Sequence, residues 1–328
     1  MNSRSENLIR TAAAWIKDCQ EPSSYACIGG SVARGDADLY SDVDLTLYGT
    51  KRTGHDQNFI YKGEYIQLEE CLLEELPTKE AIARQPWAHR FWNECYILQD
   101  EDHTLCELQS FCRDYVGSEG GRQRMLEEVT RIAHQRLADG MASWKAGNGE
   151  SAAIACFGAW AEAAYLYMWL AKGSLATGEL IPLLRETIDL DSILMLFFTC
   201  PTQHDVWHKP VSTVKALRAY LISQGTEFPF GLSDLQNQLI ERKAARYMQY
   251  KDWQNISYQL YAEALWLYFE TSNGVSFEDY KSNLPSFLQR EMEGLGFVNL
   301  SQEGCSKLQQ STEELLHLSE AQLLRNIM

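Results

Sequence analysis

The pattern of apolar residues changes near residue 115, and this change limits the folds that the chain can adopt. Before it, apolar runs are short and separated by turn residues, which is typical of strands. After it, apolar residues recur at helical spacing over long stretches. At 328 residues the chain is also longer than one hydrophobic core usually serves. The sequence therefore predicts an α+β fold, with a small mixed-sheet domain at residues 1–115 and an all-helical domain at 116–328.

The first domain is expected to begin with a helix and to continue with short strands. Residues 6–19 carry apolar side chains at helical spacing, and residues 25–29 form a short apolar run. Residues 43–48 alternate apolar with polar side chains, as a strand with one buried face does. Two more runs flank the pair 62–63, which predicts a hairpin that turns there. A last strand is predicted at 95–98.

The second domain is predicted to consist of long helices. They are expected at 120–146, 150–172, 211–224, 233–250, 252–272 and 304–326. Residues 152–171 are nearly all apolar and are just long enough to cross a bilayer. Their alanine content, the acid at their centre and the lack of basic flanks favour a buried helix of a soluble bundle instead. We therefore expect no membrane partner.

A Gly-Gly-Ser segment at 29–31 follows the predicted strand 25–29 and is expected to open a tight turn or a helix. Glycine lets the backbone approach a ligand closely, and N–H groups at such a turn favour an anion such as phosphate. Ser31 adds a hydroxyl donor, and Arg34 adds a charged fork that suits phosphate oxygens. Gly30, Ser31 and Arg34 are therefore predicted to bind a polyphosphate.

Asp42 and Asp44 flank Val43 at the start of the predicted strand 43–48. Alternation along a strand puts both carboxylates on one face, about 7 Å apart. Carboxylates that close repel each other, and a divalent cation resolves the repulsion. Hard oxygen ligands of this kind suit Mg²⁺. The sequence therefore predicts a magnesium site next to the polyphosphate turn.

These residues together resemble the signature of the DNA polymerase β-like nucleotidyltransferase superfamily. In that signature an apolar-Gly-Ser segment precedes Asp-x-Asp by about ten residues, and Gly30, Ser31 and residues 42–45 fit it. Arg34 matches a basic residue frequent in the branch that modifies aminoglycoside and lincosamide antibiotics. The resemblance implies transfer of a nucleoside monophosphate, AMP from ATP, to a hydroxyl of a small molecule. One or two Mg²⁺ ions at Asp42 and Asp44, and a role in antibiotic resistance, are implied with it.

Members of this family usually carry a third carboxylate on a following strand, aligned with the first two. The candidate strand here is residues 65–69, in which Gln67 and Glu69 share one face. Alignment by the apolar positions puts Gln67 at the expected place, and Glu69 lies one step further. We favour Glu69 as the third metal ligand, with Gln67 as the alternative.

Glu162 is the single charge within the apolar segment 152–171. A lone carboxylate in such a helix is costly unless it is paired or functional. In antibiotic-modifying members of the family, the helical domain can supply a glutamate that deprotonates the acceptor hydroxyl. Glu162 is therefore a candidate general base, and an ion pair with an Arg or Lys of another helix is the alternative.

Acidic residues outnumber basic ones by 45 to 29, which gives a formal net charge of −16. Binding of a long nucleic acid needs clustered Lys and Arg, so nucleic acid is a poor partner and an RNA-directed transferase is disfavoured. An acidic surface attracts a cationic small molecule, which fits an aminoglycoside-like acceptor. A regulatory or toxin–antitoxin-type nucleotidyltransferase, which binds or modifies a protein, is the alternative function.

The nine cysteines predict a reducing compartment. Their number is odd, no Cys-x-x-Cys pair occurs, and most lie among apolar neighbours, as reduced buried thiols do. The first twenty residues lack the apolar core of a signal peptide. We therefore expect a cytoplasmic protein.

Overall fold

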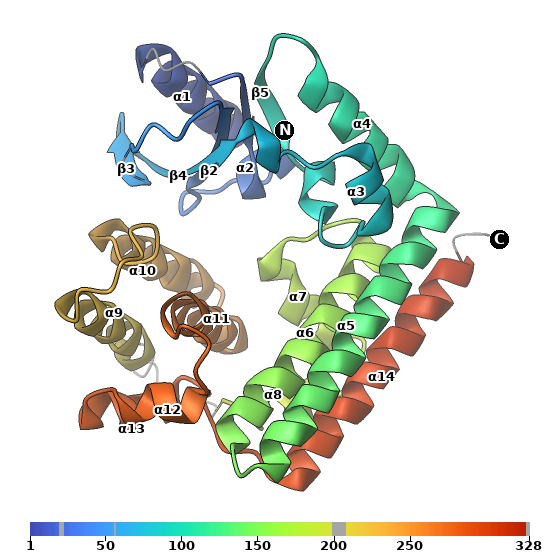
Figure 1. The fold of residues 1–328 in the computed structure, drawn as a ribbon, viewed down its shortest axis with the longest axis vertical. Helices are drawn as coiled ribbons and strands as arrows, with labels where there is room; N and C mark the ends of the chain where they lie inside the picture. Colours follow the sequence, from blue (N-terminus) through green and yellow to red (C-terminus); the bar gives the residue numbers. More distant parts are fainter. Residues whose placement is uncertain (20–22, 56, 199–207, 326–328) are drawn as a thin grey trace. The chain divides into compact units, whose positions relative to one another are not determined.

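The computed structural model describes residues 1–19, 23–55, 57–198 and 208–325. The chain divides into two compact units, Met1–Glu128 and Val129–Asn326. The first unit holds a small mixed sheet and the second is helical, so the predicted α+β class is confirmed (Figure 1). The division falls inside helix α5 (Glu119–Lys145). The boundary that we predicted between residues 115 and 116 lies ahead of it, and the acceptor-binding role of the helical part stays a prediction.

The first unit is built on a five-stranded sheet with the order β3-β4-β2-β1-β5. The strands are β1 (Tyr25–Ile28), β2 (Val43–Gly49), β3 (Asn58–Tyr61), β4 (Glu64–Leu72) and β5 (Tyr96–Asp100). The strands β2 and β4 pair in parallel, and the other neighbours pair antiparallel. Lys62 and Gly63, with φ of 51° and 82°, turn β3 into β4 as a tight hairpin requires.

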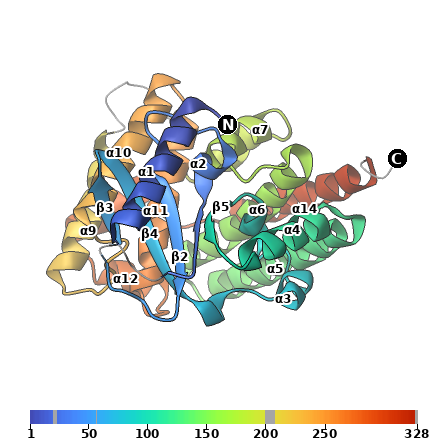
Figure 2. The ribbon, with the colours of Figure 1, turned by 90° about the horizontal axis from the view of Figure 1, so that it is seen from above.

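One face of this sheet is covered by α1 (Ser3–Cys19) and the short helix α2 (Gly30–Arg34) (Figure 2). Val43, Leu45 and Leu47 of β2 point to this face and lie in its hydrophobic core. Leu8, Ala12 and Trp15 of α1, together with Ile66 and Leu68 of β4, complete the central part of the same core. The alternation seen in the sequence of β2 therefore separates a buried apolar face from a second, more polar face.

A smaller hydrophobic core covers part of the second face. It contains Cys27, Tyr48, Cys95 and Leu105. The surrounding elements are η1 (Leu73–Glu75), α3 (Lys79–Arg84), η2 (Arg90–Asn93) and α4 (Thr104–Gly117). Near the start of β2 the same face carries the polar side chains of Asp44 and Gln67, which are partly exposed. This polar end of the sheet is where the candidate site lies.

The second unit consists of helices. They are α6 (Gly149–Lys172), α7 (Thr177–Arg185), α8 (Leu190–Leu194), α9 (His208–Ser223), α10 (Asp234–Gln249), α11 (Trp253–Thr271), α12 (Phe277–Ser282), α13 (Ser286–Gly294) and α14 (Gln302–Arg325). Helix α6 packs along α14 and against α7, and Trp160 at its centre donates a hydrogen bond to Ser311 at 3.1 Å. Aromatic rings from several helices fill the core around Phe157 and Tyr261.

Helix α6 is the one described helix that is long and apolar enough to cross a membrane. Within the structure, 67% of its most apolar window is buried by neighbouring residues. A core helix of a helical bundle passes the same test of length and composition, so the feature is weak evidence for a membrane span. Our expectation of a protein without a membrane partner stays a prediction.

Candidate active site

Strand β2 directs the two predicted metal ligands away from the core. Val43 and Leu45 are 0% and 1% exposed on the apolar face, so the alternation of the strand turns Asp44 to the other side. Asp42 directly precedes the strand, two residues before Asp44, so it lies on the same face as Asp44. It is 8% exposed. A carboxylate that is buried to this extent needs polar partners or a cation.

The glycine turn lies directly against Asp44. The Gly29 N–H donates to the backbone carbonyl of Asp44 at 2.8 Å, which joins the end of β1 to the start of β2. Gly30 has φ of 62°, a conformation that L side chains rarely adopt. A Cβ at Gly30 would collide with Oδ2 of Asp44. The structure therefore brings the predicted polyphosphate turn and the predicted metal carboxylate into contact.

Ser31 connects this turn to the loop that precedes Asp42. Its hydroxyl lies 3.0 Å from the hydroxyl of Ser41, which is buried. Ser41 also accepts a hydrogen bond from the Asp38 N–H at 2.9 Å. Ser41 therefore links the loop before Asp42 both to Ser31 and to Asp38. We did not single out Ser41 from the sequence, where its signal is only the three-residue spacing from Asp38 typical of a local turn.

Arg34 stands at the end of α2 and forms two ion pairs. Its Nε lies 3.4 Å from Asp36 and its Nη1 lies 3.3 Å from Glu94. The Glu94 side chain is 10% exposed, so this pair fixes the guanidinium more firmly than a surface contact would. A guanidinium has five N–H donors, and the two contacts leave others for an anion. The predicted phosphate-binding role of Arg34 stays a prediction, and no pattern in the sequence pointed to Glu94.

The register of β2 and β4 decides which residue is aligned with Asp44. The pairs are Asp44 with Gln67 and Thr46 with Glu69. Gln67 also reaches Asp42, because its Nε2 donates to Oδ2 of that carboxylate at 3.0 Å. The aligned position is therefore held by an amide. Glu69, which we had favoured for it, is exposed two residue pairs further along, on the same face.

Glu162 forms an ion pair in the second unit. Its Oε1 lies 3.0 Å from Nη2 of Arg136 on α5, and the two side chains are 22% and 41% exposed. This is the arrangement that the alternative interpretation of Glu162 predicted. The pair accounts for the carboxylate within the apolar helix, and the predicted role of Glu162 as a general base stays a prediction.

The smaller core on the second face of the sheet contains thiols and a phenol whose pKa values are shifted. Burial raises the pKa of Cys71 to about 12 and also raises the pKa of Tyr48. Cys27 and Cys95 share a hydrogen bond that raises the pKa of Cys27 and lowers that of Cys95. Cys95 also accepts a hydrogen bond from Gln109 Nε2 at 3.0 Å. Eight cysteines are free thiols, and Cys200 lies outside the described residues.

A second group of potential metal ligands lies at the start of α4. Ligand atoms of Asp100, His103 and Cys106 all lie within 4.8 Å of one another. The Asp100 carboxylate accepts the N–H groups of Leu105 and Cys106 at 3.1 and 2.8 Å, so its position is already explained by capping of the helix.

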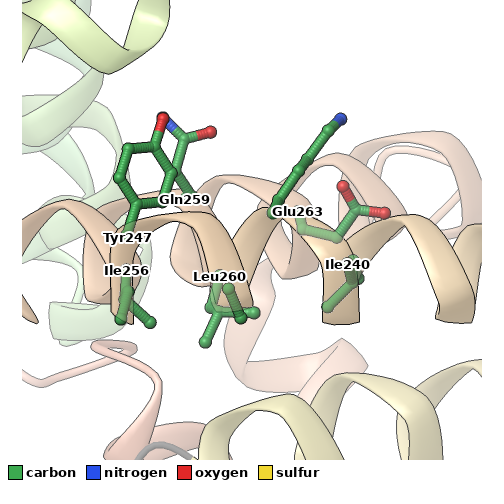
Figure 3. Close-up of a pocket in the computed structure, with 8 residues that line it drawn as sticks. Ile240, Tyr247, Ile256, Gln259, Leu260 and Glu263 are labelled. Atoms are coloured by element: carbon green, nitrogen blue, oxygen red, sulfur yellow. The ribbon is translucent and has the colours of Figure 1, made fainter. Parts of the chain in front are cut away.

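The helical unit contains a small pocket between α10 and α11. Figure 3 shows Tyr247, Gln259 and Glu263 among the side chains that line it. Its volume is about 40 Å³. Pockets for drug-sized ligands measure roughly 300–1,000 Å³, so this one suits water rather than an acceptor.

Comparisons with known proteins found structural likenesses among solved structures. No model of a known protein family and no curated protein matches the chain. A solved structure of a nucleotidyltransferase-like protein from Exiguobacterium sibiricum 255-15 aligns with 52% of this chain and 58% of that chain, with 16% sequence identity and a TM-score of 0.29. The chain thus covers less than two thirds of that protein. A likeness at this TM-score is too coarse to bear on function, so the function proposed below rests on the residues of the sheet.

Proposed function

We propose that the chain is a nucleotidyltransferase that moves a nucleoside monophosphate, AMP from ATP, to a hydroxyl group of a small molecule. The supporting observation is the contact between the Asp44 carboxylate and the Gly30 turn. A turn that binds polyphosphate, next to a carboxylate pair that binds a divalent cation, is the arrangement that phosphoryl-type transfer requires.

The residues present fit a magnesium ion. Asp42 and Asp44 supply the hard oxygen ligands that Mg²⁺ prefers. The Asp44 carboxylate occupies the space beside Gly30 that a Cβ would fill. Asp42 accepts a hydrogen bond from Gln67, a neutral amide that does not balance the negative charge of the carboxylate. Mg²⁺ bound by these two residues would neutralise charge on the triphosphate.

The proposed reaction joins the acceptor oxygen to the α-phosphorus of the nucleotide. The bond between that phosphorus and the oxygen bridging to the β-phosphate breaks, and pyrophosphate leaves. Ser31, Arg34 and the N–H groups of the turn bind the β- and γ-phosphates, so that the α-phosphate is held for in-line attack.

Glu69 is our proposal for the group that accepts the proton of the acceptor hydroxyl. It is exposed on the same face of the sheet as Asp44 and lies two residue pairs away, about 7 Å along the strand. A carboxylate in this position is accessible to an acceptor, whereas Glu162 is held by Arg136. Glu69 is thus assigned to proton transfer, in place of the metal-ligand role that we predicted from the sequence.

For the acceptor we propose a cationic small molecule, such as an aminoglycoside-like or lincosamide-like antibiotic. The supporting observation is the formal net charge of −16, which attracts cations and repels nucleic acid. A cytoplasmic location and a role in antibiotic resistance belong to the same proposal.

A pyrophosphate-release assay tests this function. Each of the four NTPs is combined with a panel of acceptors, and wild type is compared with Asp44→Asn. We expect the variant to lose at least about 10³-fold in turnover while its melting temperature changes little. Asp114→Asn is the matched control, because Asp114 is exposed on α4 in the same unit.

The possible outcomes separate the candidate functions. Equal turnover in wild type and Asp44→Asn would refute the active-site assignment. Nucleotide binding without turnover on any acceptor, together with a protein that co-purifies, would instead support the regulatory or toxin–antitoxin-type alternative.

A further inference from the structure

We infer that the site binds one divalent cation rather than two, because Gln67 occupies the place where a third carboxylate would complete a second cation site. This inference rests on the proposed function. Three observations carry it: the pairing of Gln67 with Asp44, the hydrogen bond from Gln67 to Asp42, and the position of Glu69 two residue pairs away.

The number of negative charges at the site suits one divalent cation. Sites that hold two divalent cations keep them about 3.5–4 Å apart, so the ligands must offset a strong mutual repulsion. Asp42 and Asp44 together carry two negative charges, which one divalent cation balances. At the position paired with Asp44, Gln67 adds no charge. A second cation would therefore have to be held by the substrate alone.

The direction of the Gln67 amide also disfavours a second cation. Its Nε2 lies 3.0 Å from Oδ2 of Asp42, and only the amide nitrogen can donate to a carboxylate. The opposite orientation would place the amide oxygen against the carboxylate oxygen, with two acceptors facing each other. The N–H group therefore uses a lone pair of Asp42 and presents positive partial charge on the side where a further cation would bind.

Glu69 lies too far along the sheet to replace the missing ligand. Its partner in the register is Thr46, so it lies about 7 Å along the sheet from the level of Asp44 and about 13 Å from that of Asp42. Ligand oxygens of Mg²⁺ lie at about 2.0–2.1 Å from the ion, so residues that share one ion bring their oxygens close together. The register keeps Glu69 out of that range.

Counting bound Mn²⁺ tests the inference without measuring turnover. The probe is Mn²⁺ with an ATP analogue that has a methylene group between the α- and β-phosphorus atoms, so that no transfer occurs. Free Mn²⁺ is quantified by its electron paramagnetic resonance signal. All proteins carry His103→Ala as a background change, since Asp100, His103 and Cys106 could bind Mn²⁺ independently.

Four proteins are compared in that background. We expect one Mn²⁺ per bound nucleotide for the protein with Gln67, and two for Gln67→Glu, which supplies the missing carboxylate at nearly constant shape. Gln67→Met removes the donor without adding charge and should bind one. Gln302→Glu adds the same charge at an exposed position on α14 and should also bind one.

The outcomes keep this inference separate from the proposed function. Two Mn²⁺ ions per nucleotide in the protein with Gln67 would overturn the inference and leave the function standing. An equal count in the Gln67 protein and in a folded Gln67→Glu variant would show that residue 67 does not set the number. If the Gln67 protein bound no complex of Mn²⁺ and the nucleotide, and so behaved like Asp44→Asn, the proposed function itself would be overturned.

Discussion

The carboxylate of Asp44 lies in the space that a side chain on Gly30 would fill. Gly30 also has a positive φ, so two independent features of its backbone exclude other residues. The glycine requirement at this position thus comes from a charged group on the neighbouring strand as well as from the turn. This relationship predicts that a substitution at Gly30 disturbs both the conformation of the turn and the position of the Asp44 carboxylate.

Gly30→Ala should therefore abolish binding of the metal–nucleotide complex and lower the free energy of unfolding by about 1–3 kcal/mol. The matched control is Gly63→Ala. Gly63 has φ of 82°, but a Cβ there would meet nothing within 4 Å. The control should lose only the cost of its backbone conformation, about 1 kcal/mol, and should bind nucleotide normally. Calorimetry of nucleotide binding and chemical denaturation measure the two effects. Normal nucleotide binding by Gly30→Ala would contradict the geometry.

The roles of the two candidate bases can be separated by amide substitutions. Glu69→Gln should lower kcat by about 10²-fold or more, because it removes the proton acceptor, and should leave the affinity for nucleotide unchanged. Glu162→Gln should change kcat by less than about threefold. The ion pair of Glu162 is partly exposed, so its loss should cost less than about 1 kcal/mol of stability. Steady-state kinetics with a saturating acceptor decide between them, and the reverse pattern would return the base to Glu162.

Arg218 should be the most costly single charge to remove from the helical unit. It is 0% exposed and donates to Gly231 O at 2.7 Å, to Asn237 Oδ1 at 2.8 Å and to Glu263. Arg218→Leu leaves these acceptors without their donor and should lower the free energy of unfolding by about 3–5 kcal/mol.

Arg218→Lys is the matched variant for this position, because it keeps the charge but loses the planar set of donors. It should recover only part of the stability. Urea denaturation followed by tryptophan fluorescence measures both variants. A loss below about 1 kcal/mol for Arg218→Leu would show that the buried network contributes little.

His89 should make the protein less stable in mild acid. Burial lowers the pKa of its imidazole below the ordinary value. Below about pH 6.5 the unfolded chain then binds more protons than the folded chain, so this contribution is fully present above that pH and is lost as the pH falls. His89→Asn should flatten the dependence of the melting temperature on pH between about pH 7 and 5. His317→Asn, at an exposed position, should not. An unchanged slope in His89→Asn would exclude this role.

Much of the fold could be predicted because the local patterns are strong. The alternation at residues 43–48 predicted β2 (Val43–Gly49), and the pair 62–63 predicted the hairpin of β3 and β4. Long periodic segments predicted α5, α6 and α14 to within a few residues. Helices such as α7 and α12 were not predicted, because their few turns carry too few apolar positions to establish a period.

The site was less predictable, because it depends on contacts between distant segments. Gln67 and Glu69 share one face of β4, and alignment by the apolar positions pointed to Gln67 without fixing its partner on β2. The choice is made by the parallel register with β2, which is a long-range property. Glu94 likewise gave no signal, because its partner Arg34 is sixty residues away in the chain.

The same register has a consequence for how this strand can change. Moving β4 by two residues would preserve its alternation and bring Glu69 level with Asp44. It would also bring Glu70 opposite Leu45, which is 1% exposed in the core. Glu70 now accepts the N–H groups of Thr53 and Gly54 and would leave both behind. A short insertion or deletion ahead of β4 would thus lower stability, because it would bury Glu70 without these hydrogen bonds. A new carboxylate beside Asp44 is therefore easier to gain by a point substitution than by a shift of the strand.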